Sequence, residues 1–270
     1  MIALIRASRP YLLPILAATF FTLLGLLVFQ RTERYLTQNQ RFVLRPGELG
    51  RSQSPDLVIS GLHRASELRV NAVFAPDHGR SVFEIPIEER RVELERIPWI
   101  RSASVSRVWP NRVLAGFIER TPVAYVHLPP ERRGRPVRPR LIDEDGVLLD
   151  VPGQISGPLP VLTGVREDQS VKERSDRVLL MRRLQSELGE PGRPTSEFDV
   201  RDPENLKIVF PTGDHAVTLI LGNAEWRARF DRFLRHYPEI RRKMPNAIEL
   251  DLRFKERIIA TELDKEIDGE

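Results

Sequence analysis

The sequence predicts an α+β protein that one N-terminal helix holds in a membrane. Three observations lead to this fold class. Residues 11–29 carry no charge, residues 56–121 follow the order strand, helix, helix, strand, strand, and residues 122–261 alternate strands with two longer helices. The expected architecture is a single transmembrane helix, a small α+β domain and a larger β-rich domain with two helices.

The uncharged stretch from Tyr11 to Phe29 defines the first element. At about 1.5 Å per residue, a helix of this length measures about 28 Å, which nearly matches the hydrocarbon core of a bilayer, about 30 Å thick. A cleaved secretory signal has a shorter apolar region, about 7–15 residues, and ends in small residues, whereas this stretch is followed by Gln30 and Arg31. We therefore expect a tail over residues 1–10 and a retained transmembrane helix over residues 11–29.

The charges beside this helix do not decide its orientation. The basic residues near the span are Arg6 and Arg9 before it, and Arg31, Arg34, Arg41 and Arg45 after it. Counted literally, the positive-inside rule would keep the larger C-terminal part in the cytoplasm. The rule is weak for large domains, which cross membranes whatever their charge, so the count favours one side without settling it.

Residues 30–55 are polar, contain proline and glycine, and predict a linker between the membrane and the first folded domain. That domain covers residues 56–121. Its expected elements, in order, are strand 57–59, helix 66–74, helix 86–98, strand 100–108 and strand 113–118. Ser66 can cap the first helix and Pro86 suits the first turn of the second. Trp109, Pro110 and Asn111 predict the corner of a hairpin between the last two strands.

The second domain, residues 122–261, is expected to be mostly strand. The expected strands are 123–128, 141–149 with a turn at Asp145-Gly146, 206–210, 216–221, 247–254 and 257–261. Ser170 and Glu173 form a capping box that opens a helix ending at Gly189. Asn223 is expected to cap a second helix ending before Pro238.

The second helix carries aromatic and aliphatic residues at helical spacing. They are Trp226, Phe230, Phe233, Leu234 and Tyr237. We interpret this stripe as core packing, because such spacing places the side chains on one face. The acidic residues 262–270 are expected to form a disordered tail.

The sequence holds no recognisable catalytic or metal-binding constellation. It has no cysteine, and its five histidines are scattered, so neither thiolate chemistry nor a zinc site is expected. No nucleotide-binding loop or nucleophile elbow occurs. The acidic run 143–146 is interpreted as a hairpin turn, because the later ligands of a calcium loop are missing. A hydrolase that uses two carboxylates stays open, since nothing singles out a pair among the many acids.

The basic residues are mostly arginine, but they do not predict a nucleic-acid surface. Lys plus Arg number 42 against 38 acids, and acids and bases interleave along the chain, so no nucleic-acid partner is expected. The strongest local bias is the proline-rich insert 129–140 with its five arginines. It is interpreted as an exposed hairpin loop, while contact with anionic lipid, glycan strands or an acidic partner stays open.

Five strings of sequence occur in a characteristic order behind the single membrane span. They are Ser81–Ile85, Leu94–Val105, Arg107–Arg112, Glu119–Ala124 and Glu249–Phe254. Together they resemble the bacterial cell-division protein family FtsQ/DivIB over nearly the full chain. The insert 129–140 departs from the compact hairpin expected for that family.

The resemblance implies a POTRA domain over residues 56–121 and a β-domain over residues 122–261. It also implies a short cytoplasmic tail, a single-pass anchor in the inner membrane, and an extracytoplasmic bulk at the division septum. The resemblance implies a scaffold that joins the divisome, binds the FtsB/FtsL pair and helps regulate septal peptidoglycan synthesis. Neither catalytic residues nor a cofactor or metal is implied.

The resemblance further implies a partner-binding site on the last strand of the chain. Its residues would be Arg253, Phe254, Glu256, Arg257, Ile258, Ile259 and Ala260. A strand that ends a sheet offers unpaired N–H and C=O groups, and a partner peptide can extend the sheet there. Phe254 stands where the family often has Tyr. Other septal membrane proteins are expected at the POTRA domain and the transmembrane helix.

Two other function classes stay open from the sequence. One is a membrane-anchored extracytoplasmic hydrolase of the cell wall. The other is a POTRA-type adaptor for assembly or secretion. Adaptors of that type continue into a membrane barrel, for which these 270 residues leave no room, so the scaffold is the preferred reading.

Overall fold

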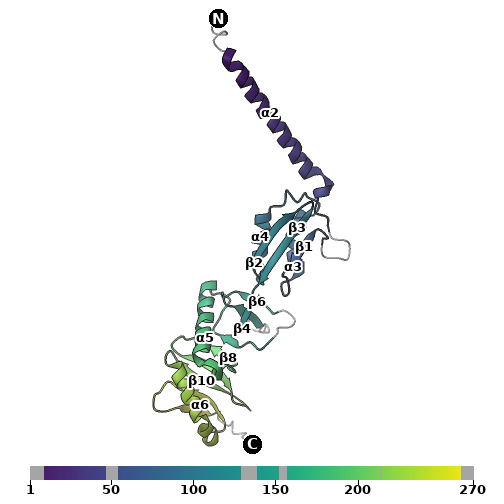
Figure 1. Cartoon of the computed structure of the whole chain (residues 1–270). Coiled ribbons are helices and arrows are strands. Elements are labelled where there is room, and N and C mark those ends of the chain that lie inside the picture. The colour runs from purple at the N-terminus through teal and green to yellow at the C-terminus, as the bar shows by residue number, and fades with distance from the viewer. Residues whose placement is uncertain (1–8, 47–53, 129–138, 152–156, 214, 263–270) are drawn as a thin grey trace. The chain divides into compact units, whose positions relative to one another are not determined.

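The structure is a computed structural model that describes residues 9–46, 54–128, 139–151, 157–213 and 215–262. It divides into two compact units, an N-terminal unit, Met1–Glu119, and a C-terminal unit, Arg120–Glu270 (Figure 1). This division lies two residues before the boundary expected after Thr121. Most of the basic insert and of the expected acidic tail, namely residues 129–138 and 263–270, lie outside the described residues.

Helix α2 covers Arg9–Gln38 and begins the N-terminal unit. Its part Pro14–Gln38 is long and apolar enough to cross a membrane, with a mean hydropathy of 1.6, and none of the apolar window is buried inside the protein. An exposed apolar helix of this length fits a lipid environment. The helix runs beyond the expected end of the span at Phe29.

The structure contradicts the first half of the linker expected over residues 30–55. The helix continues because residues 31–38 contain no glycine or proline that would stop it. The 3₁₀-helix η1 (Gln40–Phe42) follows, capped by the side chain of Asn39. Phe42 and Leu44 are then buried, so the segment after α2 belongs to the fold of the N-terminal unit.

The rest of the N-terminal unit has the expected order strand, helix, helix, strand, strand. Its elements are β1 (Leu57–Ser60), α3 (Glu67–Phe74), η2 (Ala75–Asp77), α4 (Ile87–Glu95), β2 (Ile100–Val108) and β3 (Arg112–Glu119). β3 lies between the other two strands, parallel to β1 and antiparallel to β2. Ser66 caps α3 as predicted. α4 ends before the predicted Pro98, because Arg96 and Ile97 donate to carbonyls three residues back and tighten its last turn.

The C-terminal unit is built on one mixed sheet of nine strands. The strands are β4 (Pro122–His127), β5 (Pro139–Asp143), β6 (Leu148–Asp150), β7 (Val161–Thr163), β8 (Glu197–Asp199), β9 (Leu206–Pro211), β10 (Ala216–Gly222), β11 (Ala247–Asp251) and β12 (Ile259–Glu262). Their order is β12-β11-β10-β9-β8-β7-β4-β5-β6. Neither β7 nor β8 was predicted from the sequence, because three residues are too few to show an alternating pattern.

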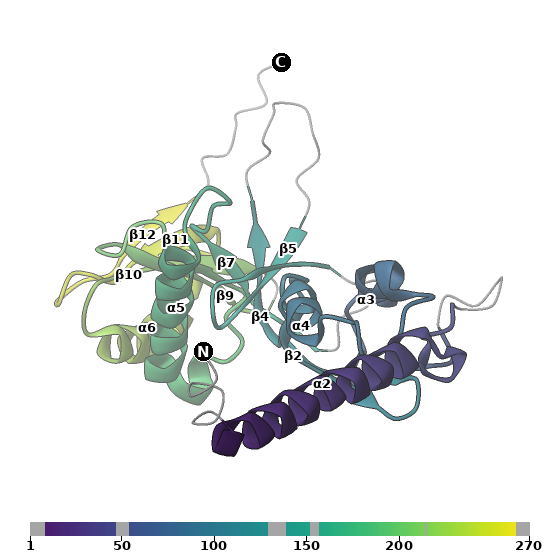
Figure 2. The same cartoon turned by 90° about the horizontal axis from the view of Figure 1, so that it is seen from above.

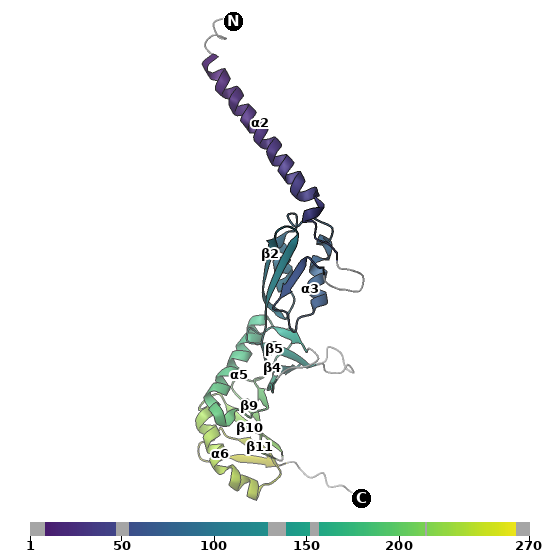
Figure 3. The ribbon, with the colours of Figure 1, turned by 45° about the vertical axis from the view of Figure 1, so that its right-hand side comes forward.

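Two helices, α5 (Val171–Gly192) and α6 (Trp226–Lys243), lie side by side along this sheet (Figure 3). The predicted capping box of Ser170 and Glu173 opens α5, and Gly189 interrupts it with a φ of 64°. The predicted cap of α6 is wrong: Glu225 occupies that position, because the Asn223 side chain donates to the carboxylate of Glu204 instead.

Helix α6 also continues through Pro238, where the sequence predicted its end. A proline inside a helix removes one hydrogen bond. The residues on both sides of it still gain by packing, since Tyr237 before the proline and Ile240 and Met244 after it lie against the hydrophobic core. Burial of these side chains therefore outweighs the local preference to stop.

The aromatic stripe of α6 forms the centre of the core, as predicted, except at one position. Phe230 and Phe233 are fully buried, and their ring centroids lie 5.3 Å and 5.8 Å from that of Phe210 on β9. Trp226 is also buried, but Leu234 is 36% exposed. The helix face that contacts the sheet is thus narrower than the sequence pattern suggested.

Candidate partner-binding site

Strand β12 ends the nine-stranded sheet and pairs on one side only. Its pairs with β11 are Asp251↔Ile259, Leu250↔Ala260, Glu249↔Thr261 and Ala247↔Glu262. Within the described part of the chain, no strand lies on its other side (Figure 2). In an antiparallel ladder, alternate residues point their N–H and C=O groups toward the neighbouring strand and the rest point away. The outer edge of β12 therefore presents main-chain donors and acceptors.

The limits of β12 correct two expectations from the sequence. The strand begins at Ile259, two residues after the predicted start at Arg257. It includes Glu262, which was assigned to the disordered tail and instead pairs with Ala247. The strand is therefore shifted toward the C-terminus.

A longer turn than predicted connects β11 to β12. The sequence predicted strands over residues 247–254 and 257–261, which leaves only Lys255 and Glu256 for the turn, whereas β11 ends at Asp251. Arg232 on α6 donates from Nη1 to the carbonyl oxygen of Lys255 at 2.6 Å and from Nη2 to that of Leu252. These carbonyls are therefore held by the helix and not by a strand ladder, which explains the early end of β11.

Arg253 folds back onto the end of β11. Its main-chain N and its Nε each donate to Oδ1 of Asp251 at 3.0 Å, and its Nη2 donates to Oδ2 at 2.7 Å. Its Nη1 donates to Oδ1 of Asn205 at 2.6 Å. The guanidinium holds the pKa of Asp251 below its ordinary value. Since these bonds occupy Nε and both terminal nitrogens, Arg253 mainly fixes the shape of the turn.

The exposed tip of the turn consists of Phe254, Glu256 and Arg257. Phe254 is 39% exposed, and the guanidinium carbon of Arg257 lies 5.0 Å from its ring centroid. A cation over an aromatic face stabilises such an exposed ring. Glu256 is exposed beside them. The tip offers one apolar face and charges of both signs to a partner.

The remaining predicted residues alternate across the sheet. Ile258 and Ala260 pack against the hydrophobic core, while Ile259 is 41% exposed. This alternation is the normal consequence of the pleat of a strand. Arg232, which holds the turn from α6, was not among the residues predicted from the sequence. An arginine among the many on α6 carries no sequence signal for that role.

The described residues of this site offer main-chain and side-chain groups for binding. Among the described residues, no three His, Asp or Glu side chains gather closely enough to hold a metal ion. A depression elsewhere in the C-terminal unit is lined by His127, Leu128, Pro139, Thr163, Gly164, Val165, Arg166, Arg177 and Arg201. None of these lining residues is an acid, so this depression does not supply the carboxylate pair that a hydrolase would use.

Two protein families match the chain. Residues 55–115 match the POTRA domain of the FtsQ type, and residues 135–253 match the C-terminal domain of the cell division protein FtsQ/DivIB. The first match covers β1, α3, η2, α4 and β2 and ends inside β3. The second ends at Arg253, before β12.

Several curated relatives are named cell division protein FtsQ. The chain is 31% identical over 212 residues to that of Koribacter versatilis, an alignment that covers 76% of this chain and 59% of the relative. It is 25% identical over 274 residues to that of Myxococcus fulvus, covering 96% of this chain and 87% of the relative. For Rhodothermus marinus the identity is 27% over 215 residues, covering 76% of each protein. The chain thus spans 59% of the length of the Koribacter protein.

Proposed function

We propose, since the chain belongs to the cell division protein FtsQ/DivIB family, that it is a non-enzymatic scaffold of the bacterial divisome. Its proposed place is the inner membrane at the division septum, with residues 1–10 in the cytoplasm and residues 31–270 outside. Its proposed partners are an FtsB/FtsL-type pair, and its proposed role is to help regulate septal peptidoglycan synthesis. The exposed apolar helix α2 supports the membrane anchor.

The open edge of β12 is the observation that carries the proposal. Its side chains are short or apolar at Ile259, Ala260 and Thr261, and the only charged residue of the strand, Glu262, lies at its end. A partner segment that pairs with this edge gains affinity from main-chain hydrogen bonds and specificity from alternate side chains. Ile259 and the tip residue Phe254 are exposed beside the edge and supply apolar contacts.

A further part of the proposal concerns other septal membrane proteins. These would contact the POTRA domain or the transmembrane helix. α2 exposes a continuous apolar surface, including Phe20 and Phe21, which supports side-by-side packing with another membrane helix through van der Waals contact.

A proline scan of β12 tests strand addition. Proline replaces Ile259, Ala260 and Thr261 one at a time in the full-length protein in detergent micelles. Substitutions at residues whose N–H points away from β11 should abolish or strongly weaken capture of a purified FtsB/FtsL pair, because proline cannot donate. These same variants should keep the melting temperature of the parent. Substitutions at residues whose N–H points toward β11 should lower it.

The matched control is Asp150→Pro at the opposite end of the same sheet, on the terminal strand β6. This variant should bind the pair like the parent. If all three β12 variants remain folded and capture the pair as the parent does, the partner does not add to this edge.

The proposed orientation has its own test. A reporter enzyme that is active only outside the cytoplasm, fused after Glu270, should be active in growing cells. A silent fusion, together with an active cytoplasmic reporter at the same place, would reverse the assignment.

A further inference from the structure

Helix α2 continues through the layer in which lipid headgroups lie. The uncharged stretch ends at Phe29. At about 1.5 Å per residue, Arg31 lies about 3 Å, Arg34 about 7.5 Å and Tyr35 about 9 Å beyond it along the helix axis. Each headgroup layer of a bilayer is about 5–8 Å thick. The long side chains of these residues therefore reach the level of lipid phosphates, on whichever side of the membrane they lie.

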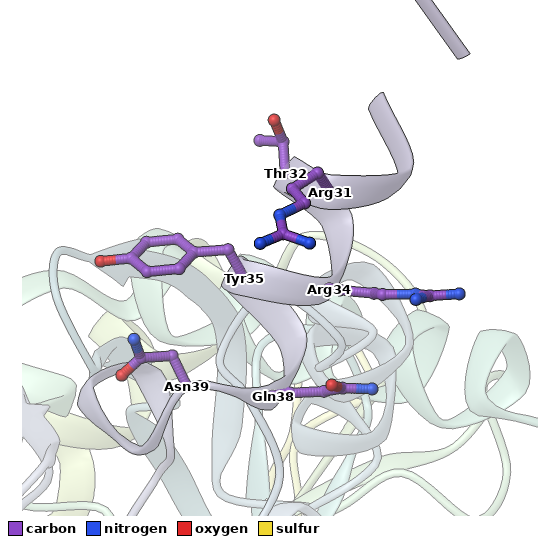
Figure 4. Close-up of a pocket in the computed structure, with 6 residues that line it drawn as sticks. All are labelled: Arg31, Thr32, Arg34, Tyr35, Gln38 and Asn39. Carbon is purple, nitrogen blue, oxygen red and sulfur yellow. The ribbon is translucent and has the colours of Figure 1, made fainter. Parts of the chain in front are cut away.

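These residues share one face of the helix. Arg31, Arg34, Tyr35 and Gln38 are spaced i, i+3, i+4 and i+7, which places them on neighbouring turns. Together with Thr32 and Asn39 they line a shallow hollow. In the view of Figure 4, Tyr35 and Arg34 extend to opposite sides and Arg31 lies between them.

The two arginines of this hollow have no anionic partner within the described part of the protein. Neither the side chain of Arg31 nor that of Arg34 makes an ion pair or hydrogen bond with another described residue. Like charges at i and i+3 on a helix repel one another. An anion held between them removes this repulsion, and a phosphate matches the planar fork of a guanidinium. The positive charge of the two arginines in this hollow is therefore complementary to the negative charge of a phosphate.

Within the N-terminal unit, the residues that follow α2 in the chain pack directly against this stretch of the helix. The hydroxyl of Ser81 donates to the carbonyl oxygen of Leu36 at 2.7 Å. The ring of the buried Phe42 lies 5.8 Å from that of Tyr35 and 5.9 Å from that of Trp109. Through these contacts, the corner of the β2–β3 hairpin at Trp109 is linked by Phe42 to the C-terminal end of α2.

Trp109 is unusual for a residue in such a packed cluster, because 69% of it is exposed. Through Phe42, its ring lies at most about 12 Å from that of Tyr35. Tryptophan and tyrosine gather at membrane interfaces, where an apolar ring meets polar headgroups. An interfacial position therefore accounts for the exposure of both aromatic side chains.

We propose that Arg31, Arg34, Tyr35 and Trp109 form a headgroup site that binds the phosphate of an anionic phospholipid in the bilayer crossed by α2. The arginines hold the phosphate, and the two rings lie among the headgroups. The occupant is a bilayer lipid because α2 enters this layer directly from its apolar stretch. Since Ser81 and Phe42 join the helix to the sheet, the bound lipid also fixes the N-terminal unit to the membrane surface.

Lipid selectivity of the full-length protein in vesicles tests this site. The probes are spin-labelled phosphatidylglycerol and spin-labelled phosphatidylcholine, each at low content in phosphatidylcholine vesicles at low salt. The protein should immobilise the anionic probe in preference to the neutral one. Arg31→Gln with Arg34→Gln should reduce that preference, by roughly fivefold for each arginine removed. Raising the salt concentration should weaken the preference of the parent.

The matched control removes two arginines from the opposite end of the N-terminal sheet. The main-chain N of Arg64 donates to Glu119 at the end of β3, and Arg96 lies four residues before Ile100, which pairs with Glu119. That end is about 23 Å from Arg112 at the start of β3. Arg64→Gln with Arg96→Gln should leave the lipid preference unchanged, although the loss of charge is the same.

Tryptophan fluorescence gives a second, independent readout. Trp99 and Trp226 are buried, at 5% and 3% exposure. Brominated phospholipid with bromine near the headgroup should therefore quench mainly Trp109, and Trp109→Phe should remove most of the quenching.

Three results would each overturn the proposal. They are equal immobilisation of the two probes by the parent, equal loss of preference in the control double variant, and no quenching of Trp109 in vesicles. A fourth is that the Arg31 and Arg34 variant keeps its lipid preference but loses capture of an FtsB/FtsL pair. In that case the hollow is a protein interface. The headgroup site uses residues far in sequence from β12. The lipid experiments can therefore fail while the β12 variants behave as proposed, and the reverse also holds.

Discussion

Two strand ends in the C-terminal unit use the same three-residue motif. Asp199-Val200-Arg201 ends β8 inside the sheet, and Asp251-Leu252-Arg253 ends β11 beside the open edge. In both, the arginine N and Nε donate to Oδ1 of the aspartate at 3.0 Å, and Nη2 donates to Oδ2. The middle residue is fully buried in both. The same aspartate–arginine arrangement thus ends a strand at both places.

The residues after the motif differ between the two places. After Arg201, Asp202 accepts hydrogen bonds from Glu204 and Asn205 and leads directly into β9. After Arg253 comes the exposed Phe254 and then an edge strand. Because the aspartate–arginine pair is common to both, we infer that partner specificity resides in Phe254 and the edge, while Arg253 positions them.

Truncation of the buried middle residues should have the largest effect and should be similar at both motifs. Leu252→Ala should lower the free energy of unfolding by about 3 kcal/mol and Val200→Ala by about 2 kcal/mol, through lost burial and the cavities left behind. Denaturant unfolding of a soluble fragment over residues 39–262, which keeps the buried Phe42 and Leu44, measures both. Leu179→Ala, at an exposed position on α5, should cost less than about 0.5 kcal/mol. A small effect at Val200 alone would show that the two motifs do not anchor their strands equally.

Phe254→Ala should reveal a difference between the two strand ends, because it should weaken partner binding without lowering the free energy of unfolding. Loss of an aromatic hot spot should weaken affinity for an FtsB/FtsL pair by about 2 kcal/mol or more, about thirtyfold. Titration calorimetry with the full-length protein gives this value. Phe83→Ala is the control, because Phe83 is exposed to a similar degree, 38% against 39%. Equal weakening by both substitutions would remove Phe254 from the partner site.

Arg232→Met should have an intermediate effect that is confined to the β11 end. The change removes the hydrogen bonds to the carbonyl oxygens of Leu252 and Lys255 and should cost about 1–2 kcal/mol of local stability. Faster amide hydrogen exchange in residues 252–258 and a several-fold weaker partner affinity are expected. Arg235→Met, at an exposed position one turn further along α6, should change neither. Unchanged exchange in the Arg232 variant would mean that the turn holds itself.

The sequence predicted the N-terminal unit better than the C-terminal one for a physical reason. Its elements carry local signals, such as the cap at Ser66 and the hairpin corner at Trp109, and its β-α-α-β-β order agrees with the structure. Helix α6 and the three-residue strands β7 and β8 depend on distant contacts instead. The helix passes Pro238 because its later residues reach the core, which no local pattern shows.

At the candidate site, the features with local sequence signals were likewise predicted, and those set by distant contacts were not. The strings around Asp251 and Arg253 located the segment, and the terminal position of β12 was expected. The length of the turn was not, since it is set by Arg232 from a helix about twenty residues earlier in the chain. The bidentate bonds of Arg253 to Asp251 likewise have no local sequence signal; they support a positioning role for that arginine, and its contact with a partner stays a prediction.

Acid titration should produce the smallest effect and the most direct comparison of the two motifs. Hydrogen bonds from Arg253 hold the pKa of Asp251 below its ordinary value. At Asp199, burial raises the pKa, but hydrogen bonds from Arg201 outweigh it and the pKa is lowered overall. A carboxyl whose folded-state pKa is lowered stabilises the fold above its ordinary pKa of about 3.9, and this stabilisation is lost as the pH falls through the folded-state value. Both strand ends should therefore loosen together below about pH 4.

Carboxyl-carbon NMR titrations of the fragment give both pKa values, and Arg201→Gln and Arg253→Gln should each raise the pKa of the paired aspartate. The loss of stability should stay under about 1 kcal/mol for each pair, because the two arginine side chains are 69% and 42% exposed to solvent. A rise at Asp251 without one at Asp199 would mean that equal hydrogen-bond geometry does not produce equal electrostatics. In that case Arg253 would have to be treated again as a residue specific to the partner site.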